Sequence, residues 1–336
     1  MEFGSVPLDR AEGAILAHSV ALGGRRLRKG LVLTSADIDR LGAGGIAEVT
    51  VARLGPGDVP EDLAATRLAK ALVPDEAVAG LVRSPAFTGR VNLNAAGPGV
   101  VDLDGAAIHA LNRIDPAITL ATLAPLTRVA KGTLTGTVKI IAYAVPEAAL
   151  ARAESMARSA IRIRPVIRRT AGLLLTEVPG QEQKLQSKGL RAVESRLRAL
   201  GMTLAAAVTT PHELAPMTAA LGDLPGDLLL ILTGSATSDL HDTGPEALRA
   251  AGGRVDRFGM PVDPGNLLFV GQLGQRPVIG LPGCARSPAL NGADWVLERL
   301  ACGLDLTDDD IAAMGVGGLL KEIPIRPQPR EFEPPQ

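Results

Sequence analysis

Glycine, hydroxyl and carboxylate groups gather in one short stretch, LTGSATSDLHD, at residues 232–242. A glycine lets the backbone approach a ligand closely, and serine and threonine hydroxyls donate hydrogen bonds to an anion. Two carboxylates, Asp239 and Asp242, then stand on either side of a histidine. This composition predicts an anion site whose candidate residues are Thr233, Gly234, Ser235, Ala236, Thr237 and Ser238.

A second glycine loop, IGLPGCARSP, occupies residues 279–288. We expect a helix to begin at Ser287, where free N–H groups and the helix dipole would favour an anion. Arg286 could hold a phosphate through two donors. The alternative is an ordinary helix cap with a surface arginine. The candidate residues of this loop are Pro282, Gly283, Cys284, Arg286 and Ser287, where Cys284 either contacts the ligand or is a small residue that fits.

The carboxylates Asp239 and Asp242 would repel a phosphate unless a cation or a donor lies between them. Mg²⁺ suits this arrangement, because it binds one or two carboxylates together with substrate oxygens. A second interpretation is that one of them accepts hydrogen bonds from the N–H groups of a heterocycle. A third is purely structural, since Asp242 stands just before a predicted helix and could cap it. His241 is interpreted as a solvated loop residue.

Strands and helices alternate from residue 161 onward, which indicates a sheet with helices on both faces. The run DLLLI is apolar throughout, as expected of a strand that is covered on both faces. Ser187 is expected to cap a helix that ends near Gly201. Because ligands of such sheets bind beyond the carboxyl ends of the strands, the loops after DLLLIL (227–232) and after PVIGL (277–281) are predicted to converge.

This pattern predicts that the chain divides into three segments. Residues 1–160 form an N-terminal α+β region, and residues 161–305 form the α/β domain. Residues 306–336 are a tail or linker, although LTDDDIAAM within them is typical of a helix start. The polar, proline-rich end is consistent with a chain that is a piece of a longer protein.

Composition excludes several classes of function. The chain has 336 residues, a net charge of −1 and only 2% aromatic residues, which argues against nucleic acid and anionic membrane as partners. Its two cysteines, Cys284 and Cys302, form no zinc pattern and indicate a reducing compartment. We see neither a signal peptide nor an apolar run of about 18 residues, so we expect a cytoplasmic protein.

Residues 165–302 resemble the molybdopterin-binding domain family of molybdenum cofactor biosynthesis proteins. The family carries a Thr/Ser-Gly-Gly segment with an aspartate at its tenth position, and TGSATSDLHD fits with Thr233 first and Asp242 tenth. The family then has a Met, a Pro-Gly pair, a strand and a Gly-Leu-Pro-Gly motif, in that order. The segment RFGMPVDPGNLLFVGQLGQRPVIGLPGCARS contains these features in the same order. GGRRLRKGLVLTSADIDRLGAGGIAEVTVARL is similar to a molybdotransferase segment. The form LPGCARSP resembles most closely the module that is fused ahead of molybdenum cofactor cytidylyltransferase-like domains.

The resemblance implies a three-layer α/β fold with a mostly parallel sheet and a homodimer. It implies molybdopterin or molybdenum cofactor as ligand, with Thr233, Gly234, Ser235, Asp242, Pro282, Gly283 and Ser287 on the binding loops. Glu177 lies roughly where the family has Thr-Gly-Asp-Glu, and is either a ligand or a solvated acid. Asp242 and Asp239 would act as the catalytic and metal-binding residues.

The chain also departs from the family pattern. Ser235 replaces the second glycine, Cys284 replaces an asparagine, and Gln186 and His212 stand where the family has acids. We therefore expect a protein that binds the cofactor and takes part in its biosynthesis, with molybdotransferase activity open. The alternative is a non-catalytic carrier that serves a nucleotidyltransferase or a molybdoenzyme. A nucleotide-binding enzyme is disfavoured, because no GxxxxGK[ST] motif occurs.

Overall fold

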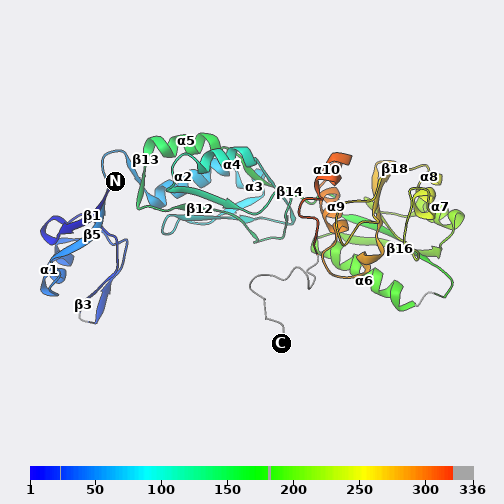
Figure 1. The fold of residues 1–336 in the computed structure, drawn as a ribbon, viewed down its shortest axis with the longest axis horizontal. Helices are drawn as coiled ribbons and strands as arrows, with labels where there is room; N and C mark the ends of the chain where they lie inside the picture. Colours follow the sequence, from blue (N-terminus) through cyan, green and yellow to red (C-terminus); the bar gives the residue numbers. More distant parts are fainter. Residues whose placement is uncertain (23, 181–182, 321–336) are drawn as a thin grey trace, which may run out of the picture. The chain divides into compact units, whose positions relative to one another are not determined.

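The structure is a computed structural model of the chain, and it describes residues 1–22, 24–180 and 183–320 (Figure 1). The proline-rich end at 321–336, predicted to be a linker, lies outside the described residues. No helix in the described part of the chain is long and apolar enough to span a bilayer.

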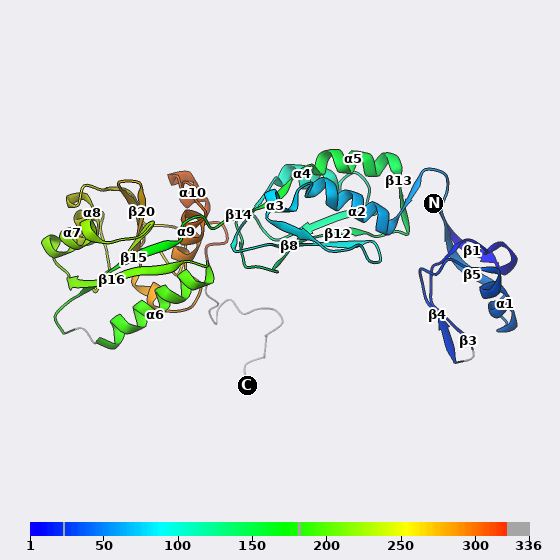
Figure 2. The ribbon, with the colours of Figure 1, turned by 180° about the vertical axis from the view of Figure 1, so that it is seen from behind.

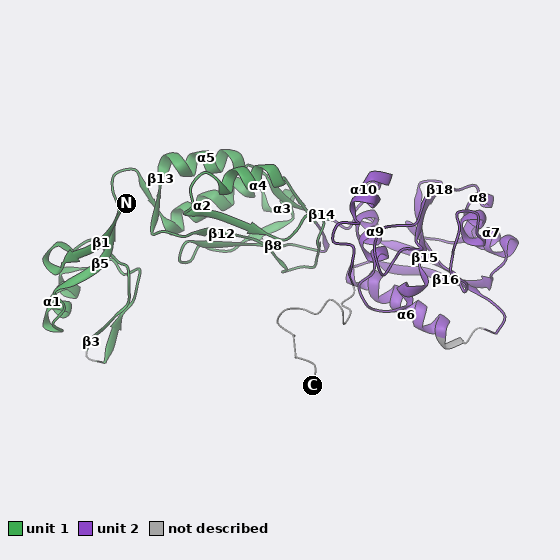
Figure 3. Cartoon of the chain, in the orientation of Figure 1, with its two compact units in different colours: residues 1–97, 101–164 green, residues 98–100, 165–336 purple. Residues whose placement is uncertain are grey.

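The chain divides into two compact units, which Figure 3 shows in different colours. The first unit contains residues 1–97 and 101–164, and the second contains residues 98–100 and 165–336. The second unit therefore includes a short segment that is embedded in the sequence of the first.

The first unit begins with a small antiparallel sheet and one helix. The sheet has the order β1-β5-β2, while β3 and β4 form a separate hairpin. A capping box starts the helix: the Thr34 hydroxyl accepts a hydrogen bond from the Asp37 N–H, and the Asp37 carboxylate accepts one from the Thr34 N–H. The elements are β1 (Glu2–Pro7), η1 (Leu8–Arg10), β2 (Ile15–Leu16), β3 (Val20–Leu22), β4 (Arg25–Leu27), α1 (Ser35–Ala43) and β5 (Glu48–Arg53).

The rest of the first unit packs helices α2, α4 and α5 against short β-sheets. Its main sheet has the order β10-β12-β8-β7. Side chains alternate along β8, so that Val91 and Leu93 join a core with Leu68 of α2 and Leu150 of α5. The elements are β6 (Asp58–Pro60), α2 (Glu61–Leu72), α3 (Glu76–Ala79), β7 (Leu81–Arg83), β8 (Arg90–Ala95), β9 (Gly99–Leu103), α4 (Gly105–Asn112), β10 (Ile118–Thr122), β11 (Arg128–Val129), β12 (Leu134–Ile140), β13 (Ala144–Pro146), α5 (Glu147–Ala157) and β14 (Ile161–Pro165).

The second unit is built on a six-stranded sheet of order β16-β15-β17-β20-β19-β18. Strands β16, β15, β17 and β20 run parallel, and β19 runs antiparallel to both of its neighbours. The elements are β15 (Thr170–Glu177), α6 (Gln183–Ala199), β16 (Thr203–Pro211), α7 (Leu214–Asp223), β17 (Leu228–Leu232), α8 (Thr243–Ala250), β18 (Arg254–Phe258), β19 (Phe269–Leu273), β20 (Arg276–Leu281), η2 (Gly283–Arg286), α9 (Gly292–Ala301) and α10 (Asp308–Ala313).

Helices cover both faces of this sheet (Figure 2). Ile231 of β17 packs in a core with Met217 of α7 and Leu248 of α8. Leu232, the next residue, faces the opposite side of the sheet. There it lies close to Gly189 of α6, because a Cβ added to this glycine would be 2.8 Å from Cδ2 of Leu232. All five residues of β17 are buried, as predicted for a strand covered on both faces. The prediction of an α/β fold with a mostly parallel sheet is thus confirmed.

Two predicted helix starts are wrong. Helix α6 begins at Gln183, so Ser187 lies inside it. Helix α9 begins at Gly292 instead of Ser287, because Asn291 forms a capping box with Asp294 and supplies the acceptor for the first turn. The helix expected at LTDDDIAAM is present as α10, within the residues assigned to a tail.

Candidate functional site

Two loops leave the carboxyl edge of the sheet side by side. Strands β17 and β20 are hydrogen-bonded neighbours, and Leu232 stands opposite Leu281 at their ends. The first loop (residues 233–242) and the second loop (residues 282–291) therefore start from adjacent positions. The structure brings together the two glycine loops that the sequence pointed to.

Hydrogen bonds hold the start of the first loop in place. The Thr233 hydroxyl donates to the carbonyl oxygen of Ser235 at 2.6 Å. The N–H of Gly234 donates to Oγ1 of Thr176, the penultimate residue of β15, at 2.8 Å. Beyond these bonds Ser235 and Ala236 are exposed, and their N–H groups have no partner among the residues that the structure describes. Two backbone donors are therefore available to an anion.

Asp242 is the N-cap of α8, so the structural interpretation of this residue is confirmed. Its Oδ1 accepts a hydrogen bond from the Thr243 N–H at 2.7 Å, and its Oδ2 accepts one from the Ser238 N–H at 2.9 Å. Partial burial works to raise the pKa of Asp242, but these N–H donors and the nearby His212 outweigh it and hold the pKa below its usual value. The carboxylate is thus ionised and fixed at the end of the loop.

Asp239 lies in a different environment from Asp242. It is exposed, and the one hydrogen bond that the described residues make to its carboxylate runs from the His241 N–H to Oδ1 at 2.8 Å. The exposed His241 ring lies 3.0 Å from Glu246, consistent with a solvated loop residue. Among the described residues, no group of three or more His, Cys, Asp or Glu side chains could hold a metal ion. Any cation at Asp239 would therefore need further oxygen ligands from water or substrate.

The second loop carries an exposed thiol. Residues 283–286 form a short 3₁₀ helix, and Sγ of Cys284 lies 3.1 Å from the Asn291 amide nitrogen, which donates to it. The Ser287 hydroxyl oxygen accepts from the Ala289 N–H at 3.3 Å. Because α9 begins beyond this point, the helix dipole expected at Ser287 acts instead at Gly292. Cys302, by contrast, is buried, and burial raises its pKa to about 11.

Arg286 is not a surface arginine, so the alternative interpretation of this loop is wrong on that point. Arg286 is only 8% exposed. Its Nη2 donates a hydrogen bond to the carbonyl oxygen of Thr233 at 2.6 Å, which connects the second loop to the first. Its Nε is buried without a hydrogen-bond partner. Burial lowers the pKa of Arg286, and no carboxylate pairs with it in the described part of the chain. A buried guanidinium without a counter-charge therefore lies where the two loops meet.

Arg196 of α6 holds the second loop in place through hydrogen bonds, and the sequence analysis did not identify it. Its Nε lies 2.5 Å from Asp294, while Nη1 and Nη2 donate to the carbonyl oxygens of Ala285 at 2.7 Å and Ser287 at 2.8 Å. The pattern Asn291-x-x-Asp294 is the sequence feature that could have located this support, because it marks where α9 starts.

Polar side chains also end the neighbouring strands β15 and β16. Oγ1 of Thr176 lies 2.9 Å from Nδ1 of His212, and the adjacent Thr210 has a buried hydroxyl without a partner. Beside them is a pocket of about 270 Å³ lined by Glu177, Val178, Pro179, Pro211, His212 and Glu213. Gln186 donates to Glu177 at 3.0 Å. Gln186 and His212 therefore both lie at this edge of the sheet.

Comparisons with known proteins find a short family match and distant structural likeness. A model described as a domain of unknown function (DUF8806) matches residues 5–53. No curated protein matches the chain. A molybdopterin biosynthesis MoeA protein from Pyrococcus horikosii is 13% identical with a TM-score of 0.31, covering 90% of this chain and 76% of that one. A molybdenum cofactor biosynthesis protein from Pyrococcus furiosus is 12% identical with a TM-score of 0.23, covering 93% and 65%. At such TM-scores, function is argued from the residues of the site.

Proposed function

We propose that the two loops bind the phosphate end of molybdopterin or of molybdenum cofactor, and that the chain takes part in the biosynthesis or hand-over of that cofactor. The observation that carries this proposal is Arg286. A buried charge without a partner is costly, and an anion bound between the loops would supply the missing counter-charge. The resemblance of both loop motifs to the molybdopterin-binding domain family suggests that this anion is the phosphate of the cofactor.

The residues of the site fit such a ligand. The free N–H groups of Ser235 and Ala236 and the hydroxyl of Ser235 would donate to phosphate oxygens. Gly283 is exposed and leaves room for close approach, with Nη1 of Arg286 3.7 Å from the place of its missing Cβ. The exposed Cys284 thiol lies on the same loop and would face the sulfur-bearing part of the ligand. The dithiolene supplies the metal-binding chemistry when it is bound.

Asp239 fits a Mg²⁺ role better than Asp242 does. Both oxygens of Asp242 already accept backbone N–H groups, whereas Oδ2 of Asp239 has no partner among the described residues. Mg²⁺ keeps several waters and needs only one or two carboxylates beside substrate oxygens. We therefore assign Asp239 as the candidate ligand and Asp242 as the group that orders the loop.

A non-catalytic carrier is the second candidate function. Gln186 and His212 occupy positions where the resemblance places acids, and both are engaged with the neighbouring Glu177 and Thr176. Loss of acids weakens metal insertion more than it weakens binding. Such a carrier would present cofactor to a nucleotidyltransferase or a molybdoenzyme.

The test is a fluorescence titration of the full chain with molybdopterin and with mature molybdenum cofactor, each with and without Mg²⁺. We expect saturable binding that weakens at least about tenfold in Arg286→Met, because charge-assisted hydrogen bonds to the ligand are lost. Arg198→Met, which changes an exposed arginine of α6, is the matched control and should bind normally.

The outcomes separate the candidate functions. Preference for the metal-loaded form would favour the carrier, and preference for the metal-free form would favour metal insertion. Binding of neither form, or binding that Arg286→Met leaves unchanged, would overturn the site assignment. ATP that competes at the same loops would point to a nucleotide-binding enzyme instead.

A further inference from the structure

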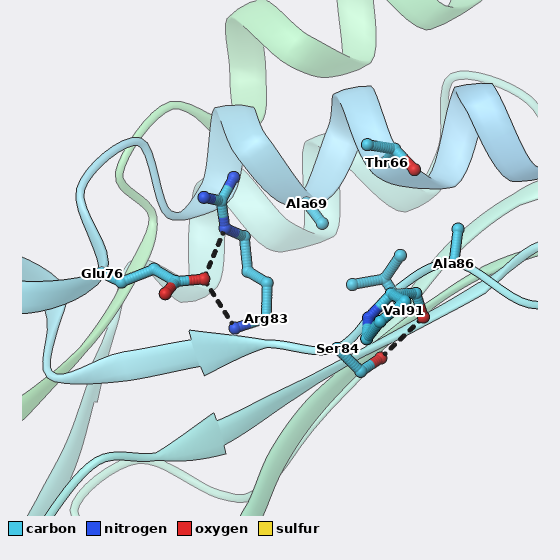
Figure 4. Close-up of a pocket in the computed structure, with 8 residues that line it drawn as sticks. Thr66, Ala69, Glu76, Arg83, Ser84, Ala86 and Val91 are labelled. Carbon is cyan, nitrogen blue, oxygen red and sulfur yellow. Dashed lines mark hydrogen bonds and ion pairs between the residues drawn. The ribbon is translucent and has the colours of Figure 1, made fainter.

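The first unit contains a pocket of about 320 Å³ between α2 and the segment that joins β7 to β8. Figure 4 shows Thr66 and Ala69 of α2 on one side and Ser84, Ala86 and Val91 on the other. Its volume is at the lower end of the range for small-molecule sites, about 300–1,000 Å³. No sequence motif assigns a function to this part of the chain.

Arg83 forms one end of this pocket and is held in a fixed orientation. Oε1 of Glu76 accepts hydrogen bonds from both the Nε and the backbone N–H of Arg83, at 3.0 Å and 2.9 Å (Figure 4). No described residue accepts a hydrogen bond from Nη1 or Nη2 of Arg83. A pair of donors that suits bidentate binding of a carboxylate is therefore oriented and available.

The other side chains that line the pocket are apolar or carry a hydroxyl that already donates a hydrogen bond within the described part of the chain. Ala69, Pro85, Ala86 and Val91 supply apolar contacts. The Thr66 hydroxyl already donates to the Asp62 carbonyl oxygen at 2.7 Å, and the Ser84 hydroxyl donates to that of Pro85 at 3.1 Å. A ligand that fits has one anionic end for Arg83 and a short apolar body.

We propose that this pocket binds a small monocarboxylate through Nη1 and Nη2 of Arg83. A single negative charge suits the site, because Glu76 already compensates one positive charge and would repel a doubly charged phosphate ester. The inference concerns the first unit and does not depend on the function proposed for the two loops of the second.

Isothermal titration of the full chain with butyrate tests the proposal. We expect millimolar binding to the wild type, and binding at least about tenfold weaker for uncharged butyramide and for Arg83→Gln. Arg113→Gln changes an exposed arginine at the end of α4 and should leave butyrate binding unchanged. Thr66→Phe fills the pocket from an exposed helix position and should abolish binding without changing the thermal midpoint.

Three results would overturn the proposal. The first is no binding of butyrate by the folded wild type, and the second is equal binding of butyrate and butyramide. The third is tighter binding of methyl phosphate, which would contradict the argument from a single charge. If Arg83→Gln fails to fold, the comparison of butyrate with butyramide and the Thr66→Phe variant still decide the question.

Discussion

Arg286 in the second unit and Arg83 in the first unit are both oriented by neighbouring oxygens, but their charges are balanced differently. Arg286 is buried, and among the described residues its hydrogen-bond partner is the neutral carbonyl group of Thr233 alone. Arg83 is partly exposed and bonded to the carboxylate of Glu76. Burial without a counter-charge favours a strongly anionic ligand, whereas a compensated, partly exposed guanidinium favours a singly charged ligand that binds less tightly. The two sites should therefore differ in ligand charge and in their effect on stability.

Arg196→Met is expected to have the largest effect on the free energy of unfolding, because it breaks a buried ion pair. It leaves the Asp294 carboxylate buried without its partner, which costs about 3–5 kcal/mol of unfolding free energy. Denaturant unfolding followed by the fluorescence of Trp295, the single tryptophan, reports on the second unit. Arg198→Met is the control. A loss no greater than that of the control would show that the pair contributes nothing to stability.

Arg286→Met should change the ligand-free stability by less than about 2 kcal/mol. The variant loses the hydrogen bond to Thr233, but it also removes a buried charge, and these two effects oppose each other. The same tryptophan-monitored unfolding measures the result. A loss as large as that of Arg196→Met would mean that the guanidinium is a structural brace, and the contrast with Arg83 would fail.

Asp242→Ala should destabilise the second unit by about 1 kcal/mol at pH 7, because α8 loses its N-cap. The folded pKa of Asp242 lies below its usual value, so the contribution is present above about pH 4 and is lost as the pH falls through the folded pKa. Wild type and variant are therefore compared by denaturant unfolding at pH 7 and at successively lower pH. A difference that grows on acidification would contradict this sign.

Glu76→Gln should have the smallest effect. The pair with Arg83 is open to solvent, so water replaces the lost contact and the thermal midpoint of the chain should stay unchanged within error. Differential scanning calorimetry measures the midpoint. A clear decrease would show that this pair is as important to its unit as Arg196–Asp294 is to the other.

The strands and the position of the two loops could be predicted because they depend on local pattern. An apolar run such as DLLLI has few alternatives to a strand covered on both faces, and β17 is buried throughout. Alternation of strands and helices then places successive loops at one edge of the sheet, which is how 233–242 and 282–291 became neighbours.

The burial of Arg286 could not be predicted, because it depends on tertiary packing. Room for the side chain comes from Gly189 of α6, where an added Cβ would lie 3.5 Å from Cγ of Arg286. Nothing in the loop sequence shows this. The helix start was misplaced for a different reason: Ser287 and Asn291 both resemble N-caps, and only Asn291 has an acid three residues later to complete a capping box.

The segment 98–100 has a consequence for synthesis and for dissection of the chain. It belongs to the second unit, where Val100 is fully buried and the Pro98 carbonyl oxygen accepts a hydrogen bond from the Val166 N–H. On the ribosome this segment emerges well before its partners, so the second unit cannot complete its packing until residues around 166 and beyond have been made. A fragment that starts at residue 165 lacks the segment altogether and should unfold more easily than the same unit in the intact chain.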